Sequence, residues 1–148
     1  MSLTVIDASA AMSWLLPTQS TLAAEAFLLA SETEEFVAPE IYAWEVANVL
    51  VQLERRGAIT DGQYVSAQRT YVGLDVQLEE PLSSSELESL ADLAREVGLS
   101  LFDTAYLALA MKLDCALATR DQALAEAAQG AGIRCNDLRD KKSLHDRP

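Results

Sequence analysis

The sequence predicts an α/β protein, a three-layer sandwich in which helices cover both faces of a parallel sheet of about five strands. Short apolar segments alternate with longer amphipathic segments along the chain, as is typical of strands joined by helical crossovers. The first short segment, residues 3–7, is apolar or β-branched until it ends in an aspartate, as expected of a strand buried on both faces. The chain has 148 residues without long linkers or internal repeats. We therefore place one domain at residues 1–138 and a polar, flexible tail at residues 139–148.

Breaker and capping residues delimit the elements of the first half. Pro17 ends the helix that follows the first strand, and Ser20 or Thr21 caps the next one. Gly57 stops a longer helix, and Thr60 begins another. The elements expected here are helices over residues 8–16, 21–30, 41–56 and 60–71 and a strand over residues 36–38.

The second half follows the same pattern. Ser83 and Glu86 supply the cap and the first-turn acid of a helix, and Gly98 lies behind its end. Asp103 opens a strongly apolar helix, and Asp121 opens a shorter one after a buried strand. The elements expected here are strands over residues 75–78, 115–118 and 133–135 and helices over residues 83–97, 103–113 and 121–129.

Missing residue types exclude several kinds of chemistry. The single histidine, His145, lies in the tail, so Ser-His-Asp or Cys-His catalysis has no support. The chain lacks a GxxxxGK[ST] loop, and Gly130 with Gly132 is only a fragment of a dinucleotide fingerprint that a simple turn explains. Cys115 and Cys135 are expected to be reduced core residues, and without a Cys/His cluster we expect no zinc site.

The overall charge bears on possible ligands. The net charge is −12, and because residues 139–148 contribute +2, the rest of the chain carries −14. So acidic a body argues against a nucleic-acid ligand unless metal ions or local basic residues mediate the contact. Neither a signal peptide nor an apolar run as long as a membrane span is present, so we expect a soluble, cytoplasmic protein.

Acidic residues in apolar or structurally punctuated surroundings are the candidates for chemistry. They are Asp7, Glu45, Asp103 and Asp121. Each has an ordinary alternative, since the aspartates stand where helix caps are expected and the glutamate can be a plain exposed helical residue. Two of the four leave the carboxyl ends of strands and two come from helices between them, so they can converge in one crevice at that edge of the sheet.

Two polar residues can support these acids. Asn48 lies one helical turn after Glu45 and can orient it or add a ligand contact, and Thr119 can bond to the carboxylate of Asp121. Carboxylates without histidine or thiolate favour a hard cation, Mg²⁺ or Mn²⁺. Like charges held close together raise one another's pKa, and a cation would relieve that repulsion, activate a water and polarise a phosphoryl oxygen.

The segments that carry these acids follow one another in a recognisable order. They are Val5-Ile6-Asp7-Ala8-Ser9, Glu45-Val46-Ala47-Asn48-Val49-Leu50, Asp103-Thr104-Ala105-Tyr106-Leu107-Ala108-Leu109-Ala110 and Leu117-Ala118-Thr119-Arg120-Asp121. In this order and at these separations they resemble a PIN domain, and within that superfamily the VapC toxins of bacterial and archaeal toxin–antitoxin pairs. The resemblance spans residues 3 to about 135.

This resemblance implies a metal-dependent endoribonuclease that hydrolyses phosphodiester bonds, leaving a 5′-phosphate and a 3′-hydroxyl. The residues that match the family pattern are Asp7, Glu45, Asp103 and Asp121 as metal-binding acids, Ser9 and Thr119 as accompanying hydroxyls, and Asn48 as the frequent helical asparagine. The family's sheet order also implies that the first and fourth strands are neighbours, which would set Asp7 beside Asp121.

The resemblance further implies a homodimer and a cognate VapB-like antitoxin that wraps a helical groove. The apolar faces of residues 20–30 and 41–53, with Trp14 and Trp44, are candidate docking surfaces, although both tryptophans also suit a core. For the RNA phosphates, Arg120 is the best candidate because it adjoins Asp121. The other candidates are Arg55, Arg56, Arg69, Arg95 and Lys112.

Two other functions fit parts of the pattern. A catalytically silent α/β module that binds a partner would use the acids only as helix caps. A phosphatase of the haloacid dehalogenase type would need an Asp-x-Asp pair after its first strand, and here the second position is Ser9.

Overall fold

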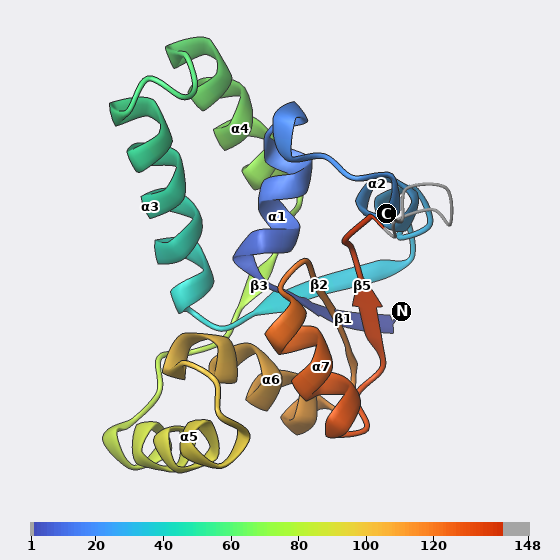
Figure 1. Ribbon diagram of the computed structural model, residues 1–148, viewed down its shortest axis with the longest axis vertical. Coiled ribbons are helices and arrows are strands. Elements are labelled where there is room, and N and C mark those ends of the chain that lie inside the picture. The colour runs from blue at the N-terminus through green and yellow to red at the C-terminus, as the bar shows by residue number, and fades with distance from the viewer. Residues whose placement is uncertain (1, 141–148) are drawn as a thin grey trace, which may run out of the picture.

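The computed structural model describes residues 2–140, and at its centre is a sheet of five parallel strands (Figure 1). The strands are β1 (Ser2–Ile6), β2 (Glu34–Ala38), β3 (Gln77–Leu78), β4 (Ala116–Thr119) and β5 (Cys135–Asp137). They lie in the order β3-β2-β1-β4-β5, with helices on both sides. The predicted α/β fold with a central parallel sheet is therefore confirmed.

Helices form the outer layers. They are α1 (Ala8–Leu15), α2 (Leu22–Leu29), α3 (Ile41–Arg55), α4 (Asp61–Gly73), α5 (Ser84–Val97), α6 (Leu101–Leu113) and α7 (Gln122–Gly130), with a short 3₁₀ turn, η1 (Pro17–Gln19). In Figure 1, α6 and α7 lie on one side of the sheet and α1 on the other, while the α3–α4 hairpin extends beyond the sheet. Among residues 2–140, no helix combines the length and the apolar character needed to cross a membrane.

Several helices begin where the sequence predicts, because their caps are local. The Thr21 hydroxyl accepts a hydrogen bond from the backbone N–H of Ala24 at 2.9 Å and starts α2. Thr60 and Ser83 each start a capping box, in which the side chain three residues later bonds back to the cap's backbone N–H. These contacts join residues three apart, so they depend little on the rest of the fold.

Helix α6 begins two residues earlier than predicted. Its cap is Ser100, whose hydroxyl accepts a hydrogen bond from the backbone N–H of Asp103 at 3.1 Å. Asp103 therefore lies within the first turn, and the capping bond engages its backbone rather than its carboxylate. The alternative explanation of Asp103 as a helix cap is wrong.

The last strand begins later than predicted. The N–H of Ile133 donates to the carbonyl of Ala128 at 2.9 Å and closes the turn behind α7, which Gly132 makes possible with its φ of 76°. Residue 133 thus still belongs to the helix end, and β5 starts only at Cys135. Cys115 and Cys135 are both free and partly buried, as expected of reduced thiols in this chain.

The two tryptophans occupy different environments. Trp14 stacks on Phe27 and Phe36 at centroid distances of 6.1 and 5.8 Å, and its indole N–H donates to the carbonyl of Ala24. Trp14 is therefore held inside the layer formed by α1, α2 and β2. Trp44 on α3 is 73% exposed, so of the two only Trp44 presents its ring to a partner.

Strands β1 and β4 meet at the point where the strand order reverses. Thr4 pairs with Ala116 and Ile6 with Ala118, so the two strands end side by side. In open parallel sheets, ligands bind at such a switch point, beyond the carboxyl ends of the strands. The expected adjacency of the first and fourth strands is confirmed, and it places Asp7 next to Thr119.

Candidate active site

Asp7 follows β1 directly and lies at the switch point, only 4% exposed. Its Oδ1 accepts hydrogen bonds from the Ser9 hydroxyl at 2.8 Å and from the Ala10 N–H at 2.9 Å. Its Oδ2 accepts one from the Thr119 hydroxyl at 2.5 Å. Asp7 is thus the N-cap of α1, as its ordinary explanation predicts, but it is also a buried carboxylate fixed by three donors.

Burial is the main influence on the proton affinity of Asp7. It raises the pKa from its ordinary value of 3.8 to about 6, although the bonds from Thr119, Ala10 and Ser9 act in the opposite direction. The neighbouring charge of Asp121 raises the pKa further. A helix cap at the surface would need none of this desolvation.

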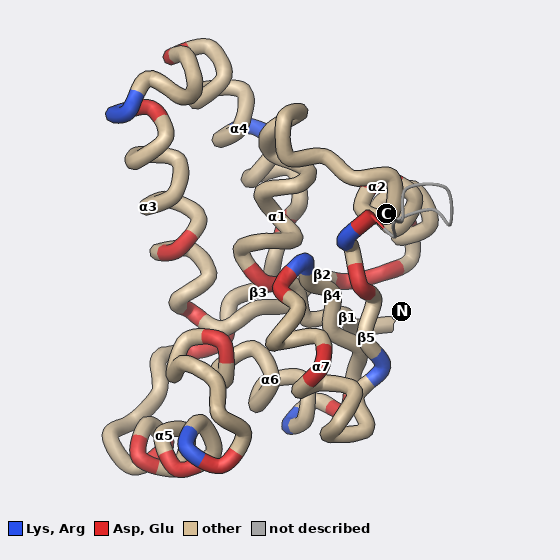
Figure 2. Tube along the Cα trace, in the orientation of Figure 1, with Lys and Arg blue, Asp and Glu red and all other residues tan. Residues whose placement is uncertain are grey.

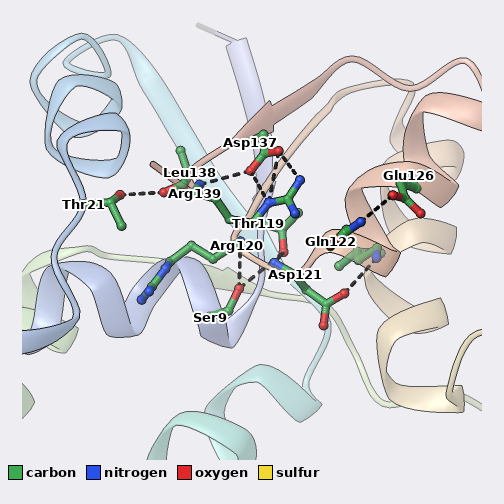
Figure 3. A network of polar contacts seen from close by, with 11 residues as sticks. Ser9, Thr21, Thr119, Arg120, Asp121, Gln122, Glu126, Asp137, Leu138 and Arg139 are labelled. Carbon is green, nitrogen blue, oxygen red and sulfur yellow. Dashed lines mark hydrogen bonds and ion pairs between the residues drawn. The ribbon is translucent and has the colours of Figure 1, made fainter. Parts of the chain in front are cut away.

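Ser9 and Thr119 join the end of β1 to the end of β4 (Figure 3). Their hydroxyls lie 3.3 Å apart, and the Ser9 hydroxyl also accepts a bond from the backbone N–H of Arg120 at 2.9 Å. Thr119 accepts from the backbone N–H of Asp121 at 2.9 Å. The expectation that Thr119 bonds to the carboxylate of Asp121 is wrong, because the end of β4 faces Asp7 instead.

Asp121 is the N-cap of α7. Its Oδ1 accepts a hydrogen bond from the Leu124 N–H at 2.9 Å. Within residues 2–140 its Oδ2 accepts no hydrogen bond, so this oxygen can bind a ligand. The capping role and a ligand-binding role are therefore compatible in Asp121.

Asp103 and Glu45 come from the helices α6 and α3. Burial raises the pKa of Asp103, the charge of Asp121 raises it further, and Ser100 opposes the shift. Burial also raises the pKa of Glu45, against a hydrogen bond from Tyr106, and the charge of Asp103 adds to the rise. Both carboxylates are partly buried, so Glu45 is not the plain exposed residue of its alternative explanation.

The four acids are neighbours in series rather than a closed set of ligands. The charge of Asp121 acts on both Asp7 and Asp103, and the charge of Asp103 acts on Glu45. Figure 2 shows acidic residues gathered where α1, α3, α6 and α7 approach one another. Among residues 2–140, however, no three acidic, cysteine or histidine side chains already stand in an arrangement that would hold a metal ion.

The donor chemistry of this cluster nevertheless fits a hard cation. All its side-chain donors are carboxylate and hydroxyl oxygens, which Mg²⁺ and Mn²⁺ prefer. An ionised carboxylate offers about four acceptor positions, and Asp7 uses only part of them on its three hydrogen bonds.

Tyr106 contacts one of the acids, a role that was not predicted from the sequence. Its hydroxyl donates to Oε1 of Glu45 at 2.8 Å, whereas Asn48, the expected partner, is exposed. The signal for Tyr106 was its position three residues after Asp103, on the same face of one helix. That spacing alone does not reveal that α3 packs opposite.

Arg120 lines an open hollow of about 630 Å³ beside the acids. The hollow is lined by Ser9, Gln19, Thr21, Arg120, Asp121, Arg139 and Asp140. The side chain of Arg120 extends away from the carboxylate of Asp121 (Figure 3) and has no ion-pair partner within the described residues. Arg120 therefore forms no ion pair with Asp121 and lines the hollow beside it.

Three of the other basic residues form ion pairs, whereas Arg55, Arg56 and Arg69 have no ion-pair partner among residues 2–140. Lys112 pairs with Glu79 at 3.5 Å, and the exposed Arg95 lies 3.9 Å from Asp92. Arg139 donates to both carboxylate oxygens of Asp137, at 2.9 and 2.6 Å.

The first residues of the predicted tail contact the domain. Asp140 accepts a hydrogen bond from the N–H of Leu22 at 2.8 Å, at the start of α2. Residues 141–148, with His145, lie outside the described residues.

Comparison with known proteins agrees with this architecture. The PIN domain family model matches residues 4–130. The chain therefore belongs to the PIN domain family. Ribonuclease VapC3 from Pyrobaculum aerophilum is 30% identical over 122 residues, which cover 82% of this chain and 92% of that protein.

Solved structures share the fold at lower sequence identity. PAE2754 from Pyrobaculum aerophilum superposes with a TM-score of 0.65 at 20% identity, covering 90% of this chain and 89% of its own. FitAcB from Neisseria gonorrhoeae gives 0.64 at 15% identity, with 91% and 97% covered. The sarcin-ricin loop cleaving toxin VapC20 from Mycobacterium tuberculosis gives 0.55 at 18% identity, with 88% and 95% covered.

Proposed function

We propose that this chain is a VapC-type endoribonuclease toxin that hydrolyses RNA phosphodiester bonds with Mg²⁺ or Mn²⁺. The observation that carries the proposal is the buried Asp7 carboxylate, fixed by three donors at the β1–β4 switch point, with Asp121 beside it. Membership of the PIN family and the similarity to Ribonuclease VapC3 support the reaction class. The catalytic domain in this proposal comprises residues 1–138.

The metal-binding residues in this proposal are Asp7, Glu45, Asp103 and Asp121. Asp7 is the rigid member of the set, while the unbonded oxygens of Asp121 and Glu45 supply further donors. When bound, the cation supplies a Lewis acid that offsets negative charge on the scissile phosphate and activates a water. Because the carboxylates repel one another, binding a cation also removes an unfavourable interaction from the folded protein.

The remaining tasks fall to side chains around the cluster. Ser9 and Thr119 hold Asp7 in place through their hydroxyls. Arg120 contacts a phosphate of the RNA from the adjoining hollow, which compensates locally for the acidic body.

Cleavage assays test this function directly. Purified protein is incubated with structured RNA in Mn²⁺ or in EDTA, alongside the Asp7→Asn and Asp103→Asn variants. Asp61→Asn, which changes an exposed acid in the first turn of α4, is the matched control. We expect metal-dependent cleavage that leaves a 5′-phosphate, that both site variants lose and that the control keeps. Cleavage in EDTA, or full activity of both site variants, would contradict the mechanism.

The same proposal extends to partners. We propose that the protein is cytoplasmic, dimerises and is inhibited by a VapB-like antitoxin that docks near the exposed Trp44. An arginine from such a partner would pair favourably with the acidic cluster. Expression should arrest growth, and co-expression of the neighbouring small gene should restore it. A protein that is harmless on expression would instead favour the catalytically silent partner-binding module.

A further inference from the structure

A tyrosine hydroxyl ties the two helices of the acidic cluster together. Tyr106 on α6 donates to Oε1 of Glu45 on α3 at 2.8 Å, across 61 residues of sequence. We infer that Tyr106 is a positioning residue that holds the Glu45 carboxylate where the metal binds. The inference rests on the proposed function, because it assigns a role toward the same metal.

Glu45 needs such a restraint. It is a partly buried side chain with three rotatable bonds, and its neighbour Asp103 carries the same charge. Left alone, a glutamate in this position gains both hydration and distance from Asp103 by turning outward into water. A hydrogen bond from a buried donor opposes that movement.

Tyr106 is built to provide the restraint. Its side chain is 1% exposed, so the surrounding core fixes the ring and thereby the hydroxyl. It lies one helical turn after Asp103, so a single helix both contributes one acid and orients another. The bond engages only Oε1 of Glu45, which leaves Oε2 for the metal.

A second buried tyrosine provides the contrast. Tyr42 lies three residues before Glu45 on α3, is 0% exposed and stacks on Tyr71 at 5.8 Å. Its hydroxyl has no hydrogen-bond partner among residues 2–140. The core therefore accepts a tyrosine hydroxyl that makes no hydrogen bond to an acid, although the charge of Asp7 acts on it, and only Tyr106 of these two bonds to a carboxylate.

The matched pair Tyr106→Phe and Tyr42→Phe tests the inference. Each substitution removes one buried hydroxyl and keeps the ring, so the core volume is preserved. Mn²⁺ affinity is measured by calorimetry without RNA, and folding by circular dichroism. We expect Tyr106→Phe to bind Mn²⁺ roughly 10- to 100-fold more weakly, as losses of residues that orient metal ligands do. Tyr42→Phe should bind Mn²⁺ like the wild type.

Two further measurements separate positioning from a structural role. In a Glu45→Ala background, Tyr106→Phe should have no effect on Mn²⁺ affinity, because the carboxylate that it orients is gone. High Mn²⁺ concentrations should also restore RNA cleavage by Tyr106→Phe toward the wild-type rate.

The possible failures are distinguishable. Unchanged Mn²⁺ affinity of Tyr106→Phe, an equal loss in the Glu45→Ala background, or unfolding of Tyr106→Phe alone would each overturn the positioning role while leaving the ribonuclease intact. A wild-type protein that neither binds Mn²⁺ nor cleaves RNA would overturn the proposed function, and the positioning role with it.

Discussion

Replacing Asp7 by asparagine should raise the free energy of unfolding of the metal-free protein at neutral pH. The folded-state pKa of Asp7 is about 6, against an ordinary value of 3.8, so the folded protein binds this proton more tightly than the unfolded chain does. Between roughly pH 4 and pH 6 the wild type therefore loses stability as the pH rises. At pH 7 the accumulated cost is about 3 kcal/mol, because each pKa unit corresponds to about 1.4 kcal/mol.

An asparagine fits the same hydrogen bonds. Its carbonyl oxygen can accept from Ser9 and from the N–H of Ala10, and its amide can donate to the Thr119 hydroxyl. Thr119 can then direct its proton to the Ser9 hydroxyl, 3.3 Å away. Because the network survives and the buried charge is removed, we expect a gain on the order of 1–3 kcal/mol at pH 7.

Urea unfolding followed by circular dichroism in EDTA, from pH 4 to pH 8, measures this difference. The gain of Asp7→Asn over the wild type should be small near pH 4 and should grow to a plateau above pH 6. Asp61→Asn, an exposed acid, should show no such growth. An Asp7→Asn protein that is no more stable than the wild type at pH 7, or a difference independent of pH, would refute the reasoning. The same variant should lose RNA cleavage, because the buried carboxylate that lowers the stability of the wild type is also needed for its activity.

Three other outcomes test neighbouring parts of the site. Mn²⁺ should stabilise the wild type against urea by about 2.7 kcal/mol at a concentration 100 times its dissociation constant, and should leave Asp7→Asn unchanged; equal stabilisation of both would place the metal elsewhere. Arg120→Ala should raise KM for RNA several-fold, on the order of one lost phosphate contact, with little change in kcat. Lys112→Ala, which removes a residue paired with Glu79, should leave KM unchanged. If cleavage kinetics give Arg120→Ala the same KM as the wild type, Arg120 does not contact the RNA. Thr119→Val should lower the free energy of unfolding, measured in urea at pH 7, by about 1–3 kcal/mol. The loss of stability with rising pH should also shift to higher pH, because the hydrogen bond that lowers the pKa of Asp7 is gone. An unchanged pH profile would show that Thr119 does not influence the pKa of Asp7.

The proposed metal site would reconcile a net charge of −12 with an RNA substrate. At this one edge of the sheet, four of the acids that make the protein negative are the proposed ligands of the cation. Arg120 adjoins this cluster and has no ion-pair partner among residues 2–140, so it offers a positive charge to phosphate beside the proposed metal ligands. Acidic surface elsewhere would discourage RNA from binding where it cannot be cut.

The sequence by itself determined the features that depend on near neighbours. The boxes at Thr60 and Ser83 are bonds across three residues, so the pattern that predicts them also contains them. The alternation of apolar and amphipathic segments likewise indicated a parallel sheet, because it records which residues must be buried. The order of the four acidic segments was sufficient to indicate the family.

Only the tertiary structure decided which groups touch. Thr119 bonds to Asp7 across 112 residues rather than to its near neighbour Asp121, because β4 lies beside β1 in the sheet. Tyr106 reaches Glu45 because α6 and α3 approach each other at the acidic cluster, whereas Asn48, on the same helix as Glu45, is exposed. Burial decided the rest, since a sequence places Asp7 at a strand end but does not state how much water the folded chain removes from it. The physical reason is that local bonds are specified by spacing along the chain, while desolvation and long-range contacts exist only once the layers have packed.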